Sequence, residues 1–138
     1  MRKYIHQISL VITAFLTVLM FDIVSGEKPY YRIVVEMGYD DVVAEPFEIV
    51  EVVIPREFDK VYQRYNELLK VGGYDLDGYK GRRCLRYTYL IPSINSRANI
   101  LVCDGQIIGG DISGITLDGI MIPIQRQAES VHLQQIYL

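Results

Sequence analysis

The sequence predicts an α+β domain: an antiparallel sheet of three to five strands packed against one main amphipathic helix and preceded by an N-terminal hydrophobic helix. Three observations lead to this prediction. Half of the 138 residues are hydrophobic, which is enough to bury the core of one domain. One long segment repeats its apolar residues with a helical period, and a run of strand-like segments follows it. We divide the chain into a leader (residues 1–26), a single domain (27–124) and a polar C-terminal tail (125–138).

The leader has the pattern of a secretory signal. Arg2 and Lys3 precede an uncharged, mostly apolar run over residues 8–21. As a helix this run would span about 21 Å, which is shorter than the hydrocarbon core of a bilayer. Cleavage after Gly26, or retention as an anchor if residues 4–7 join the run, would both place the domain outside the cytoplasm, secreted or tethered. A buried N-terminal helix of a cytosolic domain is the remaining alternative.

The clearest helix covers residues 55–71, beginning at a proline and ending before Gly72 and Gly73. Its apolar residues form one stripe with a 3.6-residue period: Phe58, Val61, Tyr62, Tyr65, Leu68 and Leu69. Residues 27–39 favour a short helix before Gly38, although their β-branched run would also suit a strand.

The remaining elements are strands separated by turn-forming residues. Asp104-Gly105 is a strong two-residue hairpin signal. The pair Gly109-Gly110 indicates a β-bulge or a place of close packing. Residues 120–124 predict a short edge strand. The other expected strands cover residues 45–54, 84–91, 97–103 and 106–112.

A symmetric hairpin over residues 84–103 would place Tyr87 opposite Ile100 and would align the apolar residues of both strands on one face. The same register brings Cys84 opposite Cys103, at a separation that a disulfide tolerates. An exported protein permits this oxidation. We therefore regard Cys84 and Cys103 as a candidate disulfide, with two half-buried free thiols as the alternative.

The composition excludes several classes of function. The formal net charge is −3, so the chain lacks the basic surface of a nucleic-acid binder. Its histidines are His6 in the leader and His132 in the tail. We therefore expect no histidine-based catalytic site, no metal site and no cofactor, and we assign no catalytic residue.

The second face of the predicted hairpin is polar and carries Arg86, Thr88, Arg97 and Asn99. If no other element covers this face, it could bind an anion or an acidic partner; otherwise it is an ordinary solvated surface.

Short motifs distributed over residues 30–123 resemble the bacterial family known as domain of unknown function 4830. The resemblance implies a small exported or membrane-tethered bacterial protein, and it brings no activity, cofactor or catalytic residue. The motifs are Ile54-Pro-Arg-Glu-Phe58, Tyr62-x-x-Tyr65-Asn66-Glu67-Leu68, Gly73-Tyr-Asp-Leu76, Tyr79-x-Gly81, Arg86-Tyr-Thr-Tyr89, Asp104-Gly-x-Ile-Ile-Gly-Gly-Asp111 and Leu117-Asp118-Gly119.

The function that the sequence favours is a non-catalytic module that binds a protein or an envelope ligand through its sheet face or its Gly-rich hairpin. A small enzyme with a carboxylate- or tyrosine-based site is the alternative, because the domain is rich in tyrosine and in acidic residues. Two convergent acids in a deep pocket would favour the enzyme. The leader, if uncleaved, would add contact with the membrane. The acidic residues that we consider are Glu45, Glu48, Glu51, Asp111 and Asp118.

Overall fold

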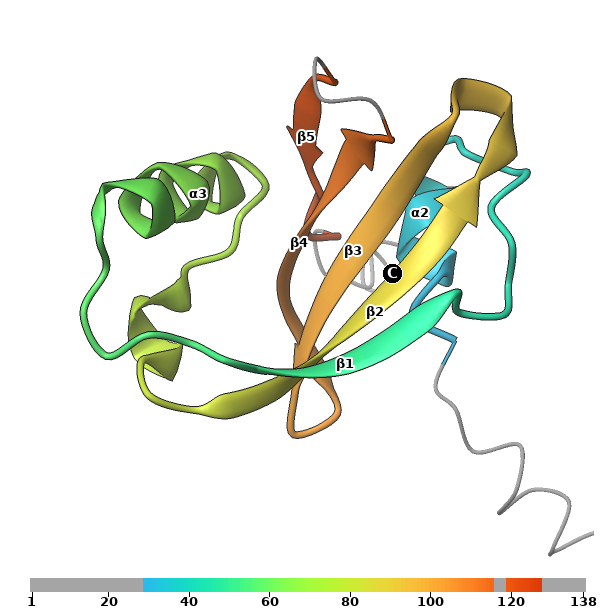
Figure 1. The fold of residues 1–138 in the computed structure, drawn as a ribbon. Coiled ribbons are helices and arrows are strands. Elements are labelled where there is room, and N and C mark those ends of the chain that lie inside the picture. The colour runs from blue at the N-terminus through green and yellow to red at the C-terminus, as the bar shows by residue number, and fades with distance from the viewer. Residues whose placement is uncertain (1–28, 116–118, 128–138) are drawn as a thin grey trace, which may run out of the picture.

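The computed structural model describes residues 29–115 and 119–127 and confirms the α+β class (Figure 1). The hydrophobic leader and residues 128–138 of the tail lie outside the described residues. The helical elements are α2 (Arg32–Glu36), α3 (Lys60–Val71) and the 3₁₀ turns η1 (Leu76–Tyr79) and η2 (Pro92–Ile94). The strands are β1 (Glu48–Val53), β2 (Arg83–Ile91), β3 (Ser96–Cys103), β4 (Gln106–Gly114) and β5 (Met121–Pro123).

The five strands form one antiparallel sheet in the order β1-β2-β3-β4-β5. The predicted register between β2 and β3 is confirmed, with Leu85 opposite Val102 and Tyr87 opposite Ile100. The predicted hairpin turn is also present: Asp104 and Gly105 both have positive φ, at 50° and 75°, as a type I′ turn requires. The turn residues and the alternation of apolar and polar residues were therefore enough to predict how these strands pair.

The apolar face of the sheet is covered by the short helix α2, which lies behind β2 and β3 in Figure 1. The ring of Tyr30 packs on Tyr87 with centroids 4.9 Å apart, and Tyr31 packs on Tyr89 at 6.2 Å. Val34 of α2 and Ile100 of β3 are fully buried. This side holds much of the hydrophobic core.

The main helix begins later than the sequence predicts. The expected start at Pro55 is wrong, because Asp59 caps the helix: its carboxylate accepts a hydrogen bond of 2.8 Å from the Tyr62 amide. Such a cap satisfies one of the free N–H groups of the first turn. Val61, which we expect in the core stripe, is 74% exposed, whereas Leu69 at the other end is fully buried.

Helix α3 packs on the sheet face opposite to α2, and its closest approach is at its C-terminal end. A Cβ atom on Gly109 would lie 2.7 Å from Leu69 Cδ1, so the glycine lets the Leu69 side chain pack directly against the backbone of β4. The segment after β5 joins the same contact, since the Arg126 amide donates a 2.7 Å hydrogen bond to the Gly72 carbonyl. The helix is therefore held close to the sheet near Leu69.

Candidate functional site

A cleft of about 570 Å³ lies between α3 and the face of the sheet that α2 leaves open. Its walls are mostly apolar and come from both sides: Val61, Tyr62 and Leu68 from α3, and Val52, Leu101 and Met121 from the strands. Its polar lining residues are Arg64, Tyr65, Arg86, Asn99 and Asp111. Ligand sites in proteins commonly combine apolar walls with a few convergent polar groups in this way.

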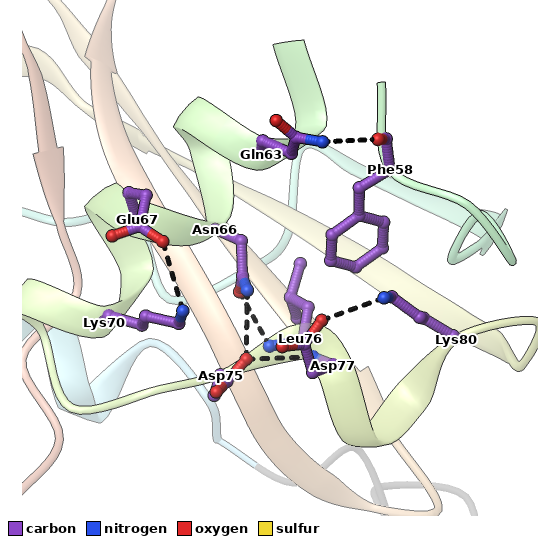
Figure 2. A network of polar contacts seen from close by, with 9 residues as sticks. All are labelled: Phe58, Gln63, Asn66, Glu67, Lys70, Asp75, Leu76, Asp77 and Lys80. Atoms are coloured by element: carbon purple, nitrogen blue, oxygen red, sulfur yellow. Dashed lines mark hydrogen bonds and ion pairs between the residues drawn. The ribbon is translucent and has the colours of Figure 1, made fainter. Parts of the chain in front are cut away.

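A polar network fixes α3 as one wall of the cleft (Figure 2). Asn66, which is 3% exposed, accepts a 2.7 Å hydrogen bond from the Leu76 amide and donates one of 3.0 Å to Asp75. Lys80 pairs with Asp77 at 3.1 Å and places its ammonium 4.5 Å from the Phe58 ring centre. These contacts tie the helix to η1, on the side away from the cleft.

A chain of hydrogen bonds connects the polar residues of the cleft. The Tyr65 hydroxyl donates to Asp111 Oδ1 at 2.8 Å, and the Asn99 amide donates to Asp111 Oδ2 at 3.2 Å. The Thr88 hydroxyl donates to Asn99 Oδ1 at 3.1 Å. Asp111 and Thr88 are only 4% and 3% exposed. We call Tyr65, Thr88, Asn99 and Asp111 the polar cluster.

Burial shifts the proton equilibria of this cluster. It raises the pKa of Asp111, although hydrogen bonds from Tyr65, Asn99 and Ser113 oppose the shift. It also raises the pKa of Tyr65, and the neighbouring Asp111 carboxylate raises it further. The Tyr65 hydroxyl therefore stays protonated and remains a donor to Asp111.

Arg86 carries the one buried side-chain donor of the described residues that lacks a hydrogen-bond partner. Its Nη2 donates to Glu48 Oε2 at 3.2 Å. Its Nε is buried and has no hydrogen-bond partner within the part of the chain that the structure describes. A buried donor without an acceptor is costly, so an acceptor supplied by a ligand would be favourable at this position.

The structure divides the patch predicted from the sequence. Arg86 and Asn99 line the cleft, and Thr88 lies buried beside them. Arg97 does not line it: its guanidinium lies over the exposed Phe47 ring, 5.6 Å from the centroid. Three of the four predicted residues therefore lie in the cleft and its polar cluster, whereas Arg97 belongs to a separate surface contact.

The sequence prediction did not place Asp111 and Tyr65 in the site. Asp111 reaches the cleft because the β3–β4 register shifts by one residue: Val102 faces Ile107, whereas Leu101 faces Gly109. If the strand ran from Gln106 without this register shift, Ile108 would pair with Leu101, and Asp111 would lie opposite Ala98 and face the α2 side. The Gly109-Gly110 pair was the available signal, since it predicted a bulge at this place.

The two cysteines are both buried free thiols in the structure. They lie one residue beyond the last β2–β3 pair, Leu85 and Val102. Burial, followed by the neighbouring Cys103, raises the pKa of Cys84 to about 12. The disulfide between them remains a prediction.

Comparison with known protein families, with curated proteins and with solved structures found no match to this chain. The resemblance to domain of unknown function 4830 therefore remains a prediction. Within residues 29–115 and 119–127, no group of three or more metal-ligating side chains converges. The same residues contain no helix with the length and apolar character needed to cross a bilayer.

Proposed function

We propose that this protein is a non-catalytic binding module and that its ligand enters the cleft between α3 and the sheet. The observation that carries the proposal is the cleft itself, which combines apolar walls from two elements with a polar cluster of low exposure. Because the members of this cluster bond to each other, they give the cleft a defined shape before any ligand arrives. Pre-organisation of this kind lowers the cost of binding.

The same geometry supports binding over acid–base catalysis. Asp111 is the one carboxylate among the described lining residues, and both of its oxygens accept hydrogen bonds. Tyr65, the nearest titratable partner, has a raised pKa, keeps its proton and donates a hydrogen bond to Asp111. A general acid and base would need two groups with separated pKa values facing a substrate.

A neutral solvatochromic dye tests whether the cleft binds apolar ligands. Val61 and Val71 lie on the same helix and are 74% and 72% exposed, but only Val61 lines the cleft. We expect Val61→Glu to weaken dye binding by about tenfold, because a charge replaces an apolar contact. We expect the matched control Val71→Glu to leave binding unchanged. Absent dye binding, or equal effects of both variants, would refute the proposal.

We further propose that the domain acts outside the cytoplasm, as an exported or membrane-tethered protein. The support is the pattern of cations followed by an apolar run in the leader. After fractionation of its native cell, the protein should be recovered outside the cytoplasm. Mass spectrometry of that material should find a chain that begins at Glu27 or retains Met1. Recovery of all the material from the cytoplasm would overturn this part.

A further inference from the structure

We propose that the cleft binds a small amphipathic anion, a single alkyl chain bearing a carboxylate or phosphate group, with Arg86 holding the anionic group. This inference rests on the proposed function, because it names the class of ligand that the same cleft would take.

The first argument is the distribution of unused hydrogen-bonding capacity. Asp111 accepts from Tyr65 and Asn99, and the Asn99 oxygen accepts from Thr88. Arg86 Nε, in contrast, is buried without an acceptor among the described residues. Because Arg86 lines the cleft, a ligand there could supply an acceptor to this guanidinium, and a carboxylate or phosphate oxygen makes the strongest bond of this kind.

The second argument is charge. The described lining contains two guanidinium groups, Arg64 and Arg86, and one carboxylate, Asp111. Burial disfavours the charged form of that carboxylate and raises its pKa. Arg64 has no ion pair with any described residue. Glu48 pairs with Arg86 at 3.2 Å but lies outside the lining. In a chain with a formal net charge of −3, the lining itself thus contains more cations than anions, which complements an anionic ligand.

The third argument is the apolar surface that the anionic group alone would not cover. Val61, Leu68, Leu101 and Met121 line the same cleft, and Met121 and Val61 are exposed at 45% and 74%. An alkyl chain would remove this surface from water, which favours binding. A bare inorganic anion would leave it exposed, so the geometry favours a ligand that has both parts.

Displacement of the neutral dye by a matched series of ligands tests the inference on the intact protein. The series is decanoate, decyl phosphate, decanol and decyltrimethylammonium, each below its micelle concentration. We expect both anions to bind about 10- to 100-fold more tightly than decanol, as a charge-assisted hydrogen bond predicts. We expect the cation to bind more weakly than decanol. The order of the two anions then distinguishes a carboxylate ligand from a phosphate ligand.

Two variants with matched controls assign the effect to Arg86. Arg86→Gln should remove most of the preference for decanoate and leave decanol affinity within about threefold, whereas Arg97→Gln, on the same face but outside the cleft, should change neither. Glu48→Gln removes the negative charge of the carboxylate that accepts from Arg86 Nη2 at 3.2 Å and competes with an anionic ligand. It should strengthen decanoate binding up to about fivefold. Glu51 pairs with Arg83 instead, so Glu51→Gln is its control.

The outcomes separate this inference from the proposed function. If the dye binds and Val61→Glu weakens it, but decanoate binds no better than decanol, the inference fails and the binding cleft stands. If Glu48→Gln leaves decanoate affinity at the value of Glu51→Gln, Arg86 does not hold the anionic group. If neither the dye nor any member of the series binds, both proposals fail.

Discussion

Removal of the Tyr65 hydroxyl would test the polar cluster of the cleft. The substitution Tyr65→Phe keeps the ring in the helix stripe and deletes the 2.8 Å hydrogen bond to Asp111 Oδ1. Asp111 is 4% exposed, so solvent compensates poorly for the lost donor. A hydrogen bond to a charged group contributes about 1.5–3 kcal/mol, and a neutral one about 0.5–1.5 kcal/mol. We expect the free energy of unfolding to fall by the larger amount where Asp111 is ionised and by the smaller amount where it is protonated.

The pH dependence follows from the direction of the Asp111 shift. Burial raises its folded-state pKa above 3.8, the ordinary value of an aspartate. Its contribution to stability is therefore full below pH 3.8 and is lost as the pH rises through the folded-state pKa. The hydrogen bond from Tyr65 opposes this shift. In Tyr65→Phe the pKa of Asp111 therefore rises further, and the destabilisation relative to wild type grows as the pH increases.

Urea unfolding at intervals from pH 3 to pH 9 measures this difference. Tyr62→Phe is the matched control, because Tyr62 lies one turn earlier on the same helix and lines the same cleft, and its hydroxyl has no hydrogen bond to any described residue. We expect the control to change stability by less than about 0.5 kcal/mol at every pH. A destabilisation by Tyr65→Phe that is constant over the pH range, or equal to that of the control, would refute the assigned role of Asp111.

Three further predictions concern the scaffold. Asn66→Ala leaves the buried Leu76 amide without its acceptor, so we expect the free energy of unfolding, measured with heat or urea, to fall by about 1–3 kcal/mol. The control Gln63→Ala removes an exposed 3.0 Å bond to the Phe58 carbonyl and should lower it by less than about 0.5 kcal/mol. Equal losses in the two variants would contradict the role of the network. Non-reducing peptide mapping of exported, oxidised protein should link Cys84 to Cys103, with a gain of up to about 3 kcal/mol over the reduced form; two freely alkylated thiols in that material would contradict it. In the reduced protein we expect slow alkylation at neutral pH, because a pKa of about 12 for Cys84 leaves little thiolate.

The sheet could be predicted from the sequence because the signals that define its strands and turns lie in residues close together along the chain. Alternating residues fixed the faces of β2 and β3, and Asp104-Gly105 fixed the turn that follows. The start of α3 was predicted too early, because Pro55 at a helix start and Asp59 as a cap are both ordinary signals. Which of the two residues starts the helix depends on the contacts of the folded chain, and in the structure the helix starts after Asp59.

The site depended on non-local information. The predicted patch on β2 and β3 gave Arg86, Thr88 and Asn99, but the sequence could not show that the main helix lies on this face while the five-residue α2 covers the apolar one. Nor could alternation alone place Asp111, since the side of the sheet to which it points depends on the single extra residue Ile108.

The order of the strands has a consequence for how the chain folds. Each strand pairs with its neighbour in sequence, and β2 to β4 are joined by short turns whose ends meet at little entropic cost. The pairing of β1 with β2 is the exception, because α3 and η1 lie between them. We expect the β2–β4 meander to form early and β1 to dock late, so that the cleft is completed only at the end of folding.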